Sequence, residues 1–122
     1  MNLNDFEVYR LAMKFGEDVY NMVMTFNNFH KNTVGIQLVT SSDSVAANIS
    51  EGFGRYYYKD KMRFYFFARG SLFESQTWIQ KSFNRRLIDV QSFNDLMNQI
   101  KEIGIKLNNT ITQCKIKSNT SN

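Results

Sequence analysis

The sequence predicts an all-α protein, an up-down-up-down antiparallel four-helix bundle, and three observations support this prediction. Apolar residues recur at steps of three and four along four long segments, which is the period of an amphipathic helix. The 122 residues contain no proline that would interrupt a helix. No segment shows the alternation typical of a strand, and short loops between long helices favour antiparallel neighbours.

The first two helices follow from capping signals and apolar spacing. We expect the first helix to run from about Asp5 to Phe26, with Asn4 as its cap and Glu7 completing a capping box. The turn-forming segment N-N-F-H-K-N follows, and the second helix begins near Thr33. One face of the second helix carries Val34, Leu38, Ser41 or Ser42, Val45 and Ile49.

The other two helices complete a single domain. We expect the third helix from about Lys59 to Phe83 and the fourth from about Asp89 to Lys115. Residues 1–116 then form the four-helix bundle, and residues 117–122, K-S-N-T-S-N, form a disordered polar tail. The apolar stripe of the fourth helix consists of Phe93, Leu96, Met97, Ile100, Ile103, Leu107 and Ile111.

The third helix carries two apolar faces. A bundle helix needs only one, so the second face predicts an oligomer interface, although single exposed aromatic residues are also tolerated. At 100° per residue, the face expected to meet the core holds Met62, Phe66, Arg69, Phe73, Gln76 and Phe83, with Tyr65 and Leu72 beside them. The opposite face, the predicted interface, holds Phe64, Phe67, Ser71 and Trp78.

Positive charge is concentrated in the middle of the chain. The net charge is +4, but residues 55–86 hold eight basic and two acidic side chains, and residues 1–54 hold three basic and six acidic ones. The run R-Y-Y-Y-K-D-K-M-R-F-Y-F-F alternates cations with rings, and phosphates favour cations while unstacked bases favour rings. We therefore predict a weak contact with RNA or single-stranded DNA, or otherwise a solvated surface. The predicted contact residues are Arg55, Lys59, Lys61, Arg63 and Lys81 for phosphates, and Tyr56, Tyr57 and Tyr58 for bases.

The supply of reactive residues argues against catalysis. His30 is the one histidine and Cys114 the one cysteine, so the chain lacks the ligands of a zinc site and the paired Glu-x-x-His of a diiron bundle. We predict no catalytic residue, no metal and no cofactor. A single cysteine excludes an intramolecular disulfide and permits a reducing compartment. No apolar stretch is long enough for a bilayer and no signal segment is evident, so a cytoplasmic location without a membrane partner is expected.

The most distinctive segment is S-V-A-A-N-I-S-E-G-F-G-R, from Ser44 to Arg55. Its small residues make a thin helix end that another helix can approach closely. Gly52 and Gly54 allow positive φ, so they suit a helix stop and a tight turn. Asn48 and Glu51 lie one helical turn apart and are placed either to tie the turn down by hydrogen bonding or to hold Arg55.

Together with A-R-G-S-L-F-E, from Ala68 to Glu74, this segment resembles the four-helix-bundle family encoded in intervening sequences of bacterial 23S ribosomal RNA genes. That family includes the accessory bundle protein of diversity-generating retroelements. The matching positions are Ser44, Ala47, Asn48, Ile49, Glu51, Gly52, Gly54, Arg55, Gly70, Ser71, Leu72 and Glu74.

The resemblance implies a bundle over about the first 115 residues that assembles as a ring-shaped homopentamer. It favours a non-enzymatic nucleic-acid-associated or scaffolding protein. The alternative is a protein-interaction module, such as an accessory subunit that presents its ring to a reverse transcriptase and does not bind nucleic acid directly. Relatives often carry arginines after the Gln-Leu pair matched by Gln37 and Leu38, where this chain has Val39 and Thr40.

Overall fold

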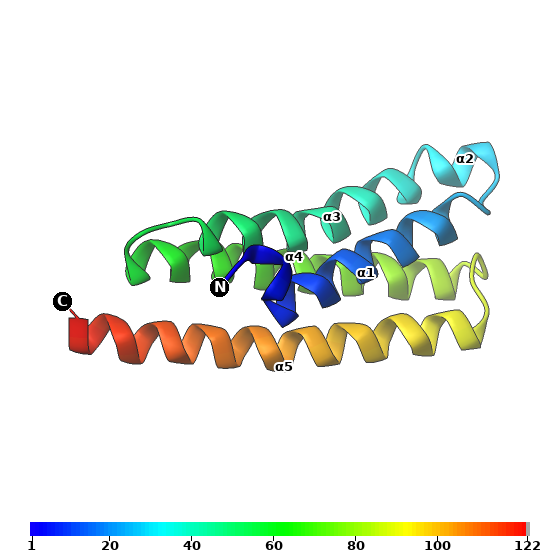
Figure 1. Ribbon diagram of the computed structural model, residues 1–122. Coiled ribbons are helices and arrows are strands. Elements are labelled where there is room, and N and C mark those ends of the chain that lie inside the picture. Colours follow the sequence, from blue (N-terminus) through cyan, green and yellow to red (C-terminus); the bar gives the residue numbers. More distant parts are fainter. Residues whose placement is uncertain (122) are drawn as a thin grey trace.

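The computed structural model describes residues 1–121 as a bundle of long antiparallel helices (Figure 1). A 3₁₀ turn, η1 (Leu3–Asp5), precedes α1 (Glu7–Val23), and the one-turn helix α2 (Asn28–Lys31) precedes α3 (Val34–Phe53). Helices α4 (Tyr58–Asn84) and α5 (Val90–Ser121) complete the bundle. The helices that pack side by side are α1 with α3, α3 with α4, α4 with α5, and α5 with α1. The predicted all-α, up-down-up-down bundle is therefore confirmed.

The start of the first helix differs from the prediction. The backbone N–H of Asn2 donates to Asp5 Oδ2 at 3.3 Å, so the capping interaction closes η1 and not α1. The Asn4–Glu7 capping box is therefore wrong, because Phe6 occupies the capping position of α1. The carbonyl of Asn4 instead accepts a hydrogen bond from Arg10 Nη1 at 2.8 Å.

Side-chain caps begin α2 and α5, whereas α3 and α4 begin without one. Asn27 Oδ1 accepts from the N–H of His30 at 3.0 Å, which turns the expected loop into α2. Asp89 Oδ1 accepts from the N–H of Ser92 at 2.8 Å, and this bond lowers the pKa of Asp89. Helix α5 continues through residues 117–121, which the sequence analysis assigns to a disordered tail, and Ser118 is buried there. Residue 122 lies outside the described residues.

The core contains the predicted apolar faces of the second and fourth helices, together with Val8, Ala12, Phe15 and Val19 of α1, but the inward face of α4 differs from the prediction. Phe66 and Phe73 are exposed, so their assignment to the core is wrong. Small residues allow α4 to lie close to its neighbours, and Ser75 Oγ donates to Ser41 Oγ of α3 at 3.1 Å. Apart from Tyr65, the rings of α4 lie outside this inward face. The buried residues of α4 are Tyr65, Ala68, Leu72, Ser75, Ile79 and Ser82.

The motif glycines serve packing and not an unusual backbone. Helix α3 ends at Phe53 with Gly54 as its C-cap, as expected, but Gly54 has φ −78° and no glycine in the described part of the chain has positive φ. A Cβ on Gly52 would lie 2.6 Å from Cε1 of Tyr65 and 3.1 Å from the carbonyl of Lys61. Gly52 therefore leaves the space that the Tyr65 ring and the backbone of α4 occupy against α3.

The end of α4 places a bulky residue in the left-handed region. Arg86 has φ 62°, and the next N–H, from Leu87, donates to the carbonyl of Ser82 at 2.9 Å, as in a Schellman cap. Glycine adopts this conformation without steric cost. We expect Arg86→Gly to raise the free energy of unfolding by about 1 kcal/mol, measured by urea denaturation. Arg85→Gly, at φ −87°, should not stabilise the protein, and an equal gain there would contradict the explanation.

Candidate nucleic-acid interface

The motif segment brings two arginines to one aromatic ring at the junction of α3 and α4. Arg55 Nη2 lies 3.3 Å from Oε2 of Glu51, which confirms the predicted contact one turn apart. The guanidinium of Arg55 lies 4.6 Å from the ring centroid of Phe64, and that of Arg63 lies 5.1 Å from the same ring. Phe67 meets Phe64 edge to face at 5.7 Å. We call Arg55, Arg63, Phe64 and Phe67 the Arg55 cluster.

Two of the three predicted tyrosines adjoin this cluster with their rings in solvent. Tyr56 is 86% and Tyr57 60% exposed, and their rings meet edge to face at 4.9 Å. Tyr58 begins α4 and is half-buried against the core, with Lys117 Nζ 5.8 Å from its ring centroid. Stacking surface is therefore available at Tyr56 and Tyr57.

Lys61 is engaged within the protein. Its Nζ donates to the carbonyl of Phe53 at 2.8 Å and to that of Gly52 at 3.4 Å, at the C-terminal end of α3, where a cation is favoured. Burial lowers the pKa of Lys61. The neighbouring Cys114 packs in the core as the sequence suggests, and burial raises the pKa of its thiol. The Lys61 side chain therefore links α3 to α4. Its ammonium group is occupied by these hydrogen bonds and does not add to the cationic surface at the Arg55 cluster.

The other cations of α4 that were predicted to contact phosphates lie at two separate places. Lys59 is exposed one turn before the exposed Arg63 of the Arg55 cluster. Lys81 is also exposed but lies about five turns further along the helix, about 27 Å from Arg63. None of these three residues forms an ion pair with another described residue. The structure thus brings Lys59 and Arg63 together with Arg55, while Lys81 stands apart.

The predicted oligomer interface is only partly open to solvent. Phe67 is 52% exposed, whereas Phe64, Ser71 and Trp78 are half-buried. Trp78 packs against the core, and its Nε1 donates to Oε2 of Glu74 at 3.0 Å. A charged residue at Trp78 would therefore disturb the bundle itself.

A second exposed apolar surface lies on the other side of α4 and was missed by the sequence analysis. Phe66 and Phe73 are exposed there, and the exposed Ile105 of α5 lines the same groove as Phe73. A signal was present, because Ile105 falls outside the apolar stripe of the fourth helix. Assigning the two phenylalanines to the core left that isoleucine without an apparent partner.

The described residues form neither a metal-binding cluster nor a membrane span. No group of three or more His, Cys, Asp or Glu side chains there is arranged to hold a metal ion. Within the same residues, no helix combines the length and apolar character needed to cross a membrane.

Known proteins share both sequence and fold with this chain. The family model described as "23S rRNA-intervening sequence protein" matches residues 4–109, which include the Arg55 cluster and both motif segments. The chain belongs to this family. A solved structure of a Bacteroides thetaiotaomicron protein of unknown function, from the S23 ribosomal protein family, is similar with a TM-score of 0.77 and 20% identity. The similarity covers 85% of this chain and 97% of that chain, and it shows a shared fold. No curated protein matches the chain.

Proposed function

We propose that this member of the intervening-sequence family is a non-enzymatic, homo-oligomeric protein that associates with nucleic acid. Its ligand is single-stranded RNA or DNA, held weakly and without sequence preference at the junction of α3 and α4. The observation that carries the proposal is the juxtaposition of the exposed rings of Tyr56 and Tyr57 with Lys59 and Arg63, which form no ion pair with any described residue.

The chemistry of this surface suits an unpaired strand better than a duplex. Lys59, Arg63 and the guanidinium of Arg55 can attract phosphates. The tyrosine rings offer faces on which any base can stack. One subunit supplies few phosphate contacts, so its affinity is low. An assembly repeats the same surface on every copy, and the contacts of one strand with several copies add. The family resemblance leads us to expect five copies.

The direct test is a binding titration with a labelled, unstructured single-stranded RNA, followed by fluorescence anisotropy at several salt concentrations. We expect measurable binding at low salt and a steep loss of affinity as salt increases. If anisotropy does not change even at low salt, the proposal fails. The alternative, a protein-interaction module such as an accessory subunit of a reverse transcriptase, then takes its place.

Ring stacking makes a separate prediction. Replacing Tyr56 and Tyr57 with alanine should weaken binding by roughly 1–3 kcal/mol per stacked base, because the ring faces are removed. Replacement of the same pair with phenylalanine should have little effect, since stacking uses the ring and not the hydroxyl. Equal losses in the two double variants, in the anisotropy assay, would show that the hydroxyl groups act instead of the rings.

A further inference from the structure

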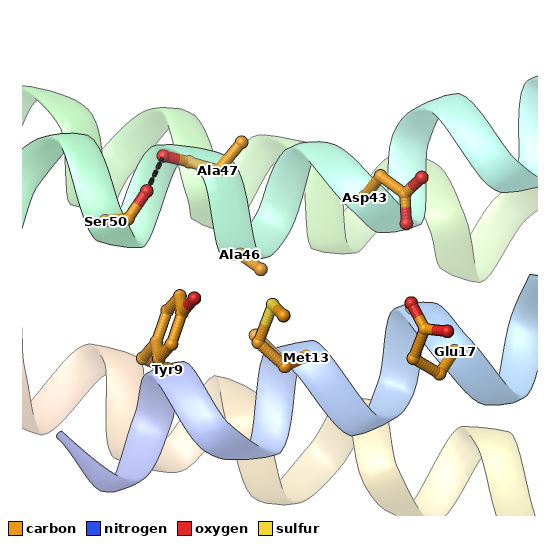
Figure 2. A pocket seen from close by; sticks show the side chains of 9 residues that line it. Tyr9, Met13, Glu17, Asp43, Ala46, Ala47 and Ser50 are labelled. Atoms are coloured by element: carbon orange, nitrogen blue, oxygen red, sulfur yellow. Dashed lines mark hydrogen bonds between the residues drawn. The ribbon is translucent and has the colours of Figure 1, made fainter. Parts of the chain in front are cut away.

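A groove between α1 and α3 is lined mainly by small residues and has two carboxylates at one end. Its volume is about 310 Å³, and Ala46, Ala47 and Ser50 contribute to it from α3. In Figure 2, Glu17 of α1 and Asp43 of α3 lie opposite each other, and Tyr9 and Met13 lie further along the same groove. We call this the acidic groove.

The carboxylates of the acidic groove have no cation beside them. The ion pairs among the described residues are Lys14–Asp18, Arg55–Glu51 and Lys106–Glu7, so neither Glu17 nor Asp43 takes part in one. Burial, and then the charge of Glu17, raises the pKa of Asp43. A cation entering the groove would relieve this unfavourable pairing of like charges.

A second groove lies between α4 and α5 and has the opposite character. Its volume is about 250 Å³, and Arg69 and Lys101 are the charged residues of its lining. Two apolar side chains project from it: Phe73 is 58% and Ile105 is 53% exposed. Neither of its cations forms an ion pair with a described residue. We call this the basic groove.

The two grooves lie on opposite sides of the bundle. Helix α1 packs against α3 and α5, and α4 packs against the same two helices. The pair α1 and α3 therefore forms one side, and the pair α4 and α5 forms the other (Figure 1). Two complementary surfaces on opposite sides of one molecule are what a head-to-tail contact between identical copies requires.

The grooves also lie at the same height along the bundle. Ser75 of α4 is hydrogen-bonded to Ser41 of α3. Because these helices are antiparallel, Phe73 is level with Asp43.

The position of α5 along α1 also places the two grooves at the same level. Gln99 Nε2 donates to Oδ2 of Asp18 at 2.9 Å. Lys101, two residues further along the antiparallel α5, is therefore level with Gly16. A neighbour displaced sideways, without sliding along the helices, would face the acidic groove with its basic groove.

We propose that copies of this chain associate head to tail, with the basic groove of one copy packed against the acidic groove of the next. Phe73 and Ile105 enter the space left by the small residues, and Arg69 and Lys101 meet Glu17 and Asp43. The apolar side chains supply the buried centre of the contact, and the opposite charges fix its orientation. The inference rests on the homo-oligomer of the proposed function and specifies which surfaces join its copies.

The first test compares two exposed phenylalanines on different sides of α4. We expect Phe73→Glu to reduce the particle from an oligomer to the 14.3 kDa monomer in light scattering at micromolar concentration. Phe67→Glu makes the same chemical change at a similarly exposed ring and should leave the oligomer intact. The reverse result would overturn this inference and place the contact at Phe64, Phe67, Ser71 and Trp78. Circular dichroism shows whether both variants keep the helices.

A charge exchange keeps the inference testable if Phe73→Glu does not fold. Glu17→Lys with Asp43→Lys should give monomers, and so should Arg69→Glu with Lys101→Glu, because each makes like charges meet. All four changes in one chain should restore the oligomer. Failure of the fourfold variant to assemble, while the unmodified protein does, contradicts the inference.

These outcomes are distinct from failure of the proposed function. An unmodified protein that is monomeric in light scattering would refute the homo-oligomer itself and this contact with it. An oligomer insensitive to both the phenylalanine and the charge variants would refute only the contact between the grooves. RNA binding is measured independently by anisotropy.

Discussion

Replacing Gly52 with alanine should lower the free energy of unfolding by about 1–3 kcal/mol, the usual cost of overpacking a core. The new methyl group would lie 2.6 Å from Cε1 of the buried Tyr65 ring and 3.1 Å from the carbonyl oxygen of Lys61, so the ring, the backbone of α4 or both must shift. Urea denaturation followed by circular dichroism measures the change.

Gly70→Ala is the matched control, because a Cβ there meets no atom within 4 Å. The same substitution at this exposed helical position should stabilise the protein by roughly 0.5–1 kcal/mol, since glycine disfavours a helix interior. The two substitutions are thus expected to have opposite signs. If Gly52→Ala were as well tolerated as Gly70→Ala, the close approach of α3 and α4 would not explain the motif glycine.

The second large effect concerns the salt dependence of RNA binding. Replacing Arg55, Lys59 and Arg63 with glutamine should flatten the slope of log affinity against log salt concentration. Each phosphate contact with a single strand contributes ~0.7 to this slope, so losing three contacts should reduce it by about 2 for each contacting subunit. Affinity at low salt should fall with it. Anisotropy titrations at several salt concentrations give both quantities.

A variant with the same change in net charge separates local contacts from long-range attraction. Lys14, Lys31 and Arg85 lie away from the Arg55 cluster, and their replacement with glutamine should leave the slope nearly unchanged. Equal flattening in the two triple variants would mean that total charge, and not the α3–α4 junction, governs binding. Lys81→Gln alone then tests whether the strand reaches about 27 Å along α4.

The sequence was sufficient for the fold because three of the four helices bury their most apolar stripe. Leu38 and Val45 of α3 and Leu107 of α5 are all fully buried, as their spacing predicts. Helix α4 is the exception, since Ala68 and Ser75 face inward while Phe66 and Phe73 face out. Apolar periodicity gives weight to large side chains, but close packing between helices selects small ones, so the orientation of α4 could not be predicted from hydrophobicity.

The candidate site was predictable only to the extent that it is local. Glu51 and Arg55 are one helical turn apart, so their contact follows from sequence spacing. The engagement of Lys61 with the end of α3 depends on how α4 returns along that helix, which no local pattern encodes. The burial of Tyr58 against the core has the same origin.

The pairing of Ser41 with Ser75, together with that of Gly52 with Tyr65, has a consequence for symmetry. These two contacts fix the position of α4 along α3, because sliding one helix by a turn would break the Ser75–Ser41 hydrogen bond and move the Tyr65 ring away from Gly52. The α1–α3 side and the α4–α5 side of the bundle are therefore held at one fixed height relative to each other. If identical copies join through these two sides, the difference in height between them determines whether the assembly closes into a ring or extends as an open helix.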